Sequence, residues 1–200
     1  MEALGNAYPA ALEIETPDRM ARWRPLVQWL LAIPHMLVLY ALGILSQVVA
    51  IITWFVVLFT GRLPASLAGV QAMYLRYENR VYAYAGFLKT AYPPFSFDTA
   101  TQDPGDYVGE IVEIEPKLEQ RNRLTVFFRL IMVIPQLIVL FFLGIAAWIC
   151  HFIGFFVVLF TGHWPEGIRQ FIVGVMRWAL RVNAYQLLMT DEYPPFSLQR

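Results

Sequence analysis

Two arginine pairs, each followed by a tyrosine, are the residues of this sequence best suited to binding chemistry. The pattern R-x3-R-V-x-A-Y occurs at 76–84 and again at 177–185. Arginines four residues apart lie on one face of a helix, and guanidinium groups bind phosphate and carboxylate through paired hydrogen bonds. The pattern therefore predicts a site for lipid phosphate or for the acidic face of a partner. Its residues are Arg76, Arg80, Tyr84, Arg177, Arg181 and Tyr185.

The alternative is that these arginines pair with acids of the same chain. Seven Asp and Glu residues lie between 98 and 120, and four more precede residue 19. Charged side chains are rarely buried unless they are paired. We expect internal pairing to be the commoner outcome for such arginines, and both hypotheses stay open on the sequence alone.

Two histidines in apolar surroundings, His35 and His151, suggest a second kind of site. Each lies about eleven residues from one end of its apolar stretch, so both are expected at the same depth, where two imidazoles could ligate a haem or a metal ion. The alternative is that each imidazole is neutral and hydrogen-bonded to a neighbouring helix. We favour this alternative, because the two positions do not correspond in the internal repeat described below.

Residue arrangements that carry catalysis are missing from the sequence. It contains no G-x-S-x-G, no glycine-rich phosphate loop, no C-x-x-C and no H-E-x-x-H. The one cysteine, Cys150, excludes an intrachain disulfide, and the net charge of zero gives no indication of nucleic-acid binding. The sequence therefore predicts a protein that is not an enzyme, has no cofactor and binds no nucleic acid.

The elements that must position these residues come in two copies. Residues 22–97 and 123–198, aligned at an offset of 101, are identical at 27 of 76 positions, and each copy closes with YPPFS. A short EIE precedes each copy at an offset of 100. Self-similarity of this kind indicates a tandem duplication. The predicted units are a first repeat at 1–97, an acidic connector at 98–120 and a second repeat at 121–200.

Charge is missing from one long block in each repeat, which indicates a membrane protein. Pro25–Gly61 and Leu130–Gly162 contain no Asp, Glu, Lys or Arg, and 58% of the chain is hydrophobic. A single helix over Leu26–Phe59 would be about 51 Å long, against about 30 Å of hydrocarbon, and would need more tilt than membrane helices show. We therefore predict a helical hairpin in each block. The hairpins cover about 25–61 and 124–162, with turns near Gly43–Gln47 and Gly144–Trp148.

Two such hairpins would place all 15 Lys and Arg residues on one side of the membrane. Because basic residues collect in the cytoplasm, this predicts a multi-pass protein of a bacterial inner membrane with both termini cytoplasmic. Each hairpin arm is short, so the hairpins either span the bilayer or enter it without emerging. The two repeats are expected to be parallel, related by a pseudo-twofold axis along the membrane normal.

A third helix and a proline-rich end are predicted after each hairpin. A glycine followed three residues later by a proline, at Gly61 and Gly162, ends one helix and starts another. Polar and apolar residues segregate over about 65–89 and 166–189, which predicts amphipathic helices lying in the membrane interface. In YPPFS the two prolines end this helix, while Tyr and Phe are expected to anchor the chain at the lipid headgroups.

The segments VGEIVEIE at 108–115 and LEIE at 12–15 alternate in the way of short strands. They predict either a small β-ribbon on the cytoplasmic side or two strands that each add to the sheet of a partner.

The motifs of the two copies resemble a known family. The carriers of the resemblance are IPH at 33–35, VVLFTGRLP at 56–64, R-x3-R-V-x-A-Y and YPPFS. Together they are similar to the bacterial membrane family called domain of unknown function 4389, present as two tandem copies. The second copy departs from the first with Gln136 in place of His35 and His163 in place of Arg62. The resemblance implies a cell-membrane location and brings no catalytic residue.

We therefore expect an all-α membrane protein whose two repeats each consist of a hairpin and an interfacial helix. Its expected function is that of a non-catalytic accessory or scaffolding subunit, which packs against a larger membrane complex or against its own copies among membrane lipids. Two alternatives stay open. One is a small transporter or lipid-handling protein with its site between the two hairpins, and the other is a membrane-shaping hairpin protein.

Overall fold

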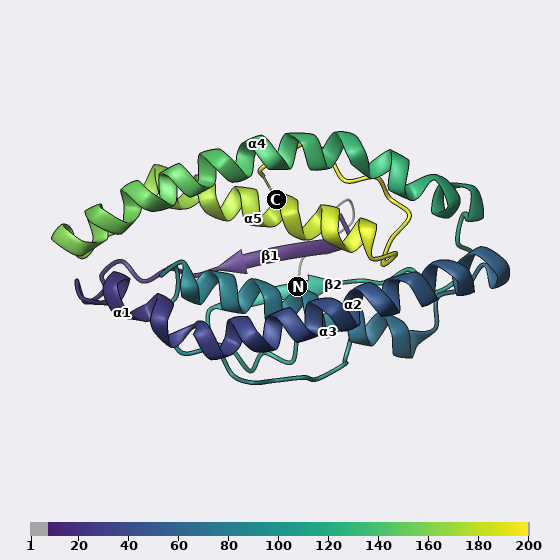
Figure 1. Cartoon of the computed structure of the whole chain (residues 1–200), viewed down its shortest axis with the longest axis horizontal. Helices are drawn as coiled ribbons and strands as arrows, with labels where there is room; N and C mark the ends of the chain where they lie inside the picture. Colours follow the sequence, from purple (N-terminus) through teal and green to yellow (C-terminus); the bar gives the residue numbers. More distant parts are fainter. Residues whose placement is uncertain (1–7, 200) are drawn as a thin grey trace, which may run out of the picture.

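The computed structural model describes residues 8–199, and within this range the chain is mostly helical with one small sheet. Figure 1 shows the elements in order. They are β1 (Ala10–Ile14), α1 (Arg24–Leu31), α2 (Ile33–Thr60), α3 (Ala65–Ala85), β2 (Glu110–Ile114), α4 (Arg123–Thr161) and α5 (Glu166–Gln186).

The predicted hairpins are wrong. Residues Gly43–Gln47 lie inside α2 and residues Gly144–Trp148 inside α4, and both helices continue without a break to their terminal glycines. The first block is interrupted at Ala32, ahead of Pro34, where α1 ends and α2 begins. Pro135 stands inside the 39 residues of α4 and does not end it. Each apolar block is therefore essentially one long helix.

The polar residues that suggested a turn in the first block pack against a neighbouring helix instead. The Ser46 hydroxyl donates to Oε1 of Gln71 in α3 at 2.5 Å, and Nε2 of Gln71 donates to the Ser46 carbonyl at 2.9 Å. Both side chains are fully buried. A buried polar pair that is hydrogen-bonded between two helices is stable inside a helix and gives the chain no reason to turn.

The ends of the helices were predicted more accurately from the sequence than the course of the chain between them. Gly61 and Gly162 take left-handed conformations, with φ of 71° and 76°, and end α2 and α4 as predicted. Helices α3 and α5 begin directly after Pro64 and Pro165. The expectation that these helices lie in a membrane interface is wrong for α3, because most of its residues are buried inside the protein on all sides.

The two strands pair into the predicted ribbon, and their register shows how the repeats are related. They are antiparallel, and Leu12 faces Val112. These two residues are also equivalents at the offset of 100 between the EIE segments. A residue that pairs with its own equivalent lies on the symmetry axis, so a pseudo-twofold axis passes through the middle of the ribbon.

The helices are arranged around this axis in layers (Figure 1). Helices α2 and α4 run in opposite directions along the long dimension of the molecule. Helix α3 packs against α2, and α5 against α4. The ribbon packs on the inner helices, with β1 on α5 and β2 on α3, so each strand contacts the third helix of the other repeat.

Glycine Gly154 allows α4 to approach the indole of Trp164, and its replacement by alanine is expected to destabilise the fold. An added Cβ would lie 2.1 Å from Cζ3 of Trp164, which is a buried side chain. We expect Gly154→Ala to cost about 2–3 kcal/mol of unfolding free energy. Thermal denaturation followed by circular dichroism measures the change. Gly144→Ala in the same helix is the control, because nothing lies within 4 Å there. Equal melting temperatures of the two variants would contradict the close contact between Gly154 and Trp164.

Candidate functional site

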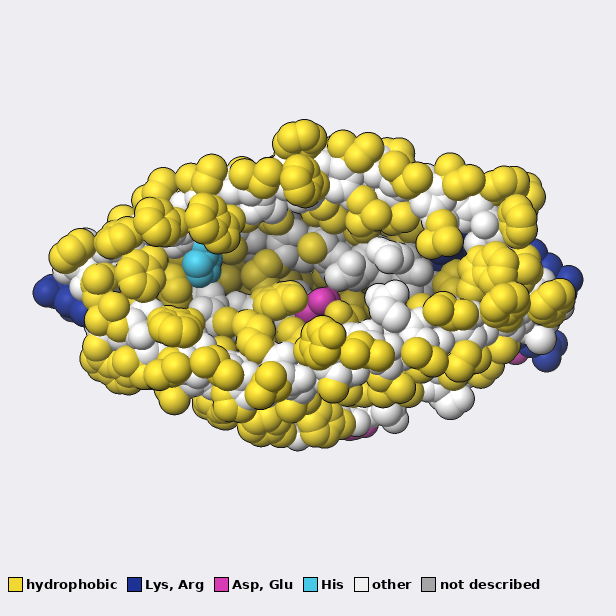
Figure 2. Space-filling model, viewed as in Figure 1, with side chains coloured by type: hydrophobic (Ala, Val, Ile, Leu, Met, Phe, Trp, Pro, Cys, Tyr) yellow, Lys and Arg dark blue, Asp and Glu magenta, His cyan; other side chains and the backbone are white. Residues whose placement is uncertain are grey.

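One face of the molecule is almost wholly apolar, and it is made by α1, α2 and α4. Figure 2 shows hydrophobic side chains covering this face, with basic side chains at the two ends of the long dimension. Helices α2 and α4 are long and apolar enough to cross a membrane, but only 22% and 11% of their most apolar windows are buried inside the protein. The most exposed members, at 67–74%, are Leu37, Tyr40, Phe59, Leu124, Leu130, Trp148 and Phe160.

Basic residues stand at both ends of this face. Exposed Arg22 lies beside Gly162, at the C-terminal end of α4, and exposed Arg123 lies beside Gly61, at its N-terminal end. The ribbon acids Glu13 and Glu113 lie next to the pseudo-twofold axis, which passes between Leu12 and Val112. Helix α2 carries no Asp, Glu, Lys or Arg, and α4 carries none after Arg129.

A groove of about 270 Å³ opens between α2 and α4. Figure 2 shows the apolar face hollowed between these two helices. Helix α2 contributes Gln47, Ala50 and Trp54 to the groove, helix α4 contributes Arg129 and Leu130, and the turn after α5 contributes Leu188. The lining is apolar except for these Gln and Arg side chains and Gln186.

Arg129 holds the chain that follows α5, and Gln28 does the same after α3. Nη1 of Arg129 donates to the carbonyls of Tyr185 and Thr190, both at 2.8 Å. Gln28, the equivalent residue of the first repeat, donates from Nε2 to the carbonyls of Tyr84 and Lys89. The duplication thus preserved the position of the bond and changed the charge of the residue that makes it.

A cluster of ion pairs around Asp191 includes Arg129, which lines the groove. Its carboxylate lies 2.9 Å from both Arg121 and Arg129 and 3.5 Å from Lys117. Burial alone would raise the pKa of Asp191, but the amide of Asn122 and the Arg121 guanidinium outweigh it and hold the pKa below its ordinary value. Three cations therefore share one ionised carboxylate.

The arginines of the repeated R-x3-R motif are placed inside the protein. Arg76 donates to carbonyls of the connector, including those of Asp98 and Gln102, at 2.8 and 3.0 Å. Arg80 pairs with Asp103 and Asp106 at 3.1 and 2.8 Å. Both guanidiniums are at most 3% exposed. For the first repeat the structure thus shows the internal pairing that the sequence left open, and Arg76 and Arg80 hold the connector against α3.

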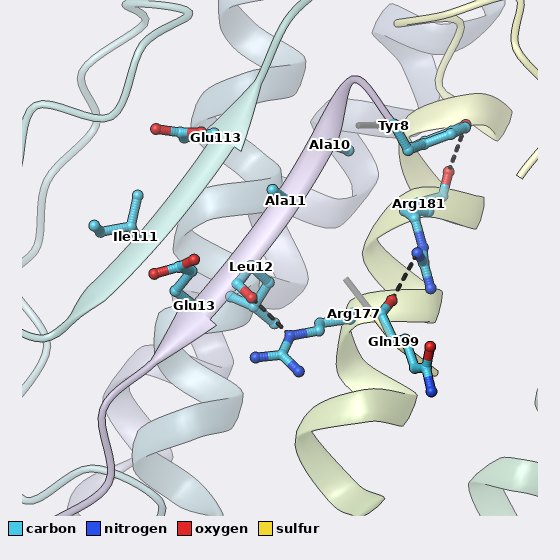
Figure 3. A pocket seen from close by; sticks show the side chains of 10 residues that line it. All are labelled: Tyr8, Ala10, Ala11, Leu12, Glu13, Ile111, Glu113, Arg177, Arg181 and Gln199. Carbon is cyan, nitrogen blue, oxygen red and sulfur yellow. Dashed lines mark hydrogen bonds between the residues drawn. The ribbon is translucent and has the colours of Figure 1, made fainter. Parts of the chain in front are cut away.

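In the second repeat the two arginines meet at a pocket of about 260 Å³ beside β1 (Figure 3). Nε of Arg177 donates to the Leu12 carbonyl at 2.9 Å, and Arg181 donates to the Gln199 carbonyl at 3.0 Å. The carboxylates of Glu13 and Glu113 line the same pocket. The guanidiniums therefore bind backbone carbonyls, and the lipid or partner site predicted for this motif stays a prediction.

Tyr84 and Tyr185, the tyrosines of the motif, are also buried, at 3% and 0% exposure. Each ring packs edge-on against the Tyr of its own YPPFS segment, Tyr92 or Tyr193. The guanidinium of Arg129 stacks 4.4 Å from the Tyr185 ring. Both tyrosines thus hold the ends of the repeats in place.

His35 and His151 occupy separate places. Nδ1 of His35 lies 2.7 Å from the Tyr77 hydroxyl, and its ring stacks on Phe95 at 4.1 Å. His151 packs against Phe87, at 4.6 Å between ring centroids. The two imidazoles share no neighbour in these contacts, and within residues 8–199 no cluster of three or more His, Cys, Asp or Glu is suited to a metal ion.

YPPFS packs back on the start of its own repeat. In the first copy Phe95 stacks on His35, and in the second copy Nε2 of Gln136, the equivalent of His35, donates to the Pro194 carbonyl at 2.6 Å. The substitution of histidine by glutamine thus keeps a contact to the same segment. The anchoring of these aromatics at lipid headgroups stays a prediction, while inside the protein Phe95 holds its segment against His35.

Glu78 is a buried acid that sequence reasoning missed. It accepts hydrogen bonds from the Tyr74 hydroxyl at 2.8 Å and from Nδ2 of Asn183 at 3.2 Å, and so joins α3 to α5. Burial raises the pKa of this carboxyl. The equivalent residue of the second repeat is Ala179. In the sequence, this difference between the two copies was the feature that could have directed attention to Glu78.

The fold and the site define a class: a tandem-repeat helical protein with one apolar face and a polar ribbon on the opposite side. The chain belongs to the family described as domain of unknown function (DUF4389), whose family model matches residues 22–96 and 123–197 as two tandem copies. No curated protein and no solved structure matches the chain.

Proposed function

We propose that the protein is a non-catalytic accessory protein of a membrane, embedded in one leaflet through the apolar face of α1, α2 and α4. One observation carries the proposal. Both long helices turn exposed apolar side chains toward the face that Figure 2 shows, while the ribbon packs on α3 and α5. A molecule built in this way has a lipid side and a water side.

The long helices are proposed to lie in the plane of the membrane and not across it. At 1.5 Å per residue, the 39 residues of α4 measure about 58 Å, almost twice the hydrocarbon thickness of about 30 Å. A crossing orientation would place the ribbon at the middle of the bilayer. Each acid there would cost about 3 kcal/mol. Lying flat keeps the ribbon out of the hydrocarbon and leaves the exposed arginines at the ends of the face in water or at the headgroups.

The rim of the face supports the same orientation. Arg22 and Arg123 at its two ends lie where anionic headgroups would meet them. Exposed Trp23, which precedes α1, and Trp29 within α1 are of the kind that collects at membrane interfaces. We propose a bacterial inner membrane and the cytoplasmic leaflet, with the ribbon and connector available to a larger membrane complex or to a second copy. Insertion into one leaflet also fits membrane shaping, because it expands one side only.

Cysteine labelling distinguishes this orientation from a crossing. In a Cys150→Ala background, Arg22→Cys and Arg123→Cys are both expected to react with a membrane-impermeant maleimide in inverted vesicles and not in intact spheroplasts. These positions lie at opposite ends of α4, so a helix that crosses the membrane would expose them on opposite sides. That outcome would contradict the proposal.

A third variant controls for reactivity. Tyr40→Cys lies on the apolar face, where the native side chain is 74% exposed in the protein. It is expected to react only after detergent is added. Reaction of this cysteine in intact vesicles would mean that the face is in water.

A further inference from the structure

The groove between α2 and α4 has an equivalent on the other side of the pseudo-twofold axis, and the two have diverged. At the offset of 101, Ala50 of the groove corresponds to His151 and Leu188 to Phe87. The Phe87 ring lies 4.6 Å from His151 and stacks on Trp164 at 5.3 Å. Rings therefore fill the position that smaller side chains leave open in the groove.

The open groove also carries a charge that its equivalent lacks. Arg129 lines it, where the other half has neutral Gln28. The Arg129 residue is 1% exposed, and its Nε has no hydrogen-bond partner among the residues that the structure describes. Because Arg129 shares Asp191 with Arg121 and Lys117, positive charge is in excess at this end of the groove.

The surroundings of the groove indicate what covers it. Ile51 and Leu130 on its two walls are 60% and 67% exposed and belong to the apolar face. An occupant must therefore present hydrocarbon to the walls and an anionic group to the buried guanidinium. A bilayer lipid with an acidic headgroup has both parts and is already next to the opening.

We propose that this groove holds one anionic phospholipid, with an acyl chain along Ala50 and Trp54 and the phosphate end toward Arg129. The inference rests on the proposed function, since only a chain embedded in a leaflet takes lipid from it. The other half of the molecule, closed by Phe87 and His151, holds none. The duplication thus produced one structural half and one lipid-binding half.

Native mass spectrometry tests this with the full-length chain reconstituted in phosphatidylcholine discs that contain a minor share of phosphatidylglycerol. After release in mild detergent, the wild-type chain is expected to retain one phosphatidylglycerol. The double variant Ala50→His, Leu188→Phe copies the filled half and is expected to retain none. Ala41→His adds the same ring to an exposed position of α2 outside the groove and is expected to behave as the wild type.

Arg129→Gln separates the headgroup from the chain. Gln28 makes the equivalent hydrogen bonds in the first repeat, so this variant is expected to fold. Its preference for phosphatidylglycerol over phosphatidylcholine should fall on the order of tenfold, which is the worth of one hydrogen bond to a charged group. Added inorganic phosphate should not displace the lipid. Displacement by phosphate would mean an anion site without lipid specificity and would overturn the proposal.

Three further results would overturn it: no retained lipid on the wild type, equal retention by the ring-filled variant, or a second copy of the chain cross-linked through the groove. Flotation of the same proteins with vesicles tests the proposed function separately. A wild-type chain that floats but retains no lipid contradicts the groove assignment alone. A chain that does not float contradicts the membrane proposal itself.

Discussion

Replacing Asp191 by threonine is expected to lower the free energy of unfolding by about 3–5 kcal/mol, the cost of removing one partner from a buried ion pair. The side chains of Arg121 and Arg129 are at most 2% exposed and lie 2.9 Å from this carboxylate. Without it, two guanidiniums stay buried beside Lys117 with no counter-charge. For a chain of 200 residues, such a loss lowers the melting temperature by roughly 10 °C.

Threonine is chosen because Thr90 stands at the equivalent position of the first repeat, where Gln28 replaces Arg129. The double variant Asp191→Thr, Arg129→Gln therefore copies two positions of the first repeat, while Arg121 keeps its charge where the first repeat has Met20. We expect it to recover at least 1 kcal/mol relative to the sum of the single variants. Thermal denaturation of all three measures the coupling. Glu192→Gln, an exposed neighbour, is expected to change little, and purely additive single effects would contradict an ion pair between Asp191 and Arg129.

The repeat and its ends were predictable because their signals are local. A glycine at the end of an apolar helix takes a left-handed conformation whatever packs around it, as Gly61 and Gly162 do. The alternation in EIE likewise predicted two strands, which pair with each other. Side chains of the same chain bind the outer edges of both strands: Arg177 donates to the Leu12 carbonyl, and Asp103 accepts from the Val112 amide.

The hairpins were mispredicted because the length argument considered only helices that cross or enter the bilayer. Such a helix of about 51 Å is too long, and a turn at the polar residues Ser46 and Gln47 resolved the conflict. A helix lying flat has no such limit. The polarity of Ser46 serves Gln71 of α3, a pairing over 25 residues that no local pattern reveals. The hairpins predicted that all basic residues lie on one side of the membrane. The proposed orientation keeps this prediction because the helices lie flat in one leaflet.

The groove went unrecognised in the sequence for a related reason. A repeated motif directs attention to what the copies share, and Arg76, Arg80 and Arg181 are shared because they hold each copy together. The groove depends on what the copies do not share. Ala50 against His151, and Arg129 against Gln28, are differences that a gapless alignment already displays. They acquire meaning only once the structure shows that these positions line equivalent places.

Glu110 is the acid through which pH is expected to act on this fold. It lies on β2 with 1% exposure, and neither carboxylate oxygen has a hydrogen-bond partner among the described residues. Burial raises the pKa of Glu110 to about 8, against the opposing effect of Arg80 and Lys89, while Asp103 adds to it. The folded protein therefore holds a proton on Glu110 at pH values where the unfolded chain, with a pKa near 4.5, has released it.

The sign of the pH effect follows from this difference. Because the folded state binds the proton more tightly, the stability that Glu110 contributes is fully present below about pH 4.5 and is lost as pH rises through about 8. Glu110→Gln keeps the shape and removes the titration. The variant should therefore gain stability relative to the wild type as pH rises from 5 to 8, by a few kcal/mol in total, and the gain should level off above pH 8.

Melting temperatures of the wild type and of Glu110→Gln, measured at half-unit steps from pH 5 to 9, test this expectation. Glu113→Gln is the matched control, because Glu113 lies on the same strand with its side chain exposed. Its melting temperature should follow that of the wild type across the whole range. A constant difference between Glu110→Gln and the wild type at every pH would show that Glu110 is already ionised in the fold. Glu110 would then add a third carboxylate charge, after those of Asp103 and Asp106, to the buried cluster around Arg80. The interior around Glu110 would be far more polar than the 1% exposure of this residue implies.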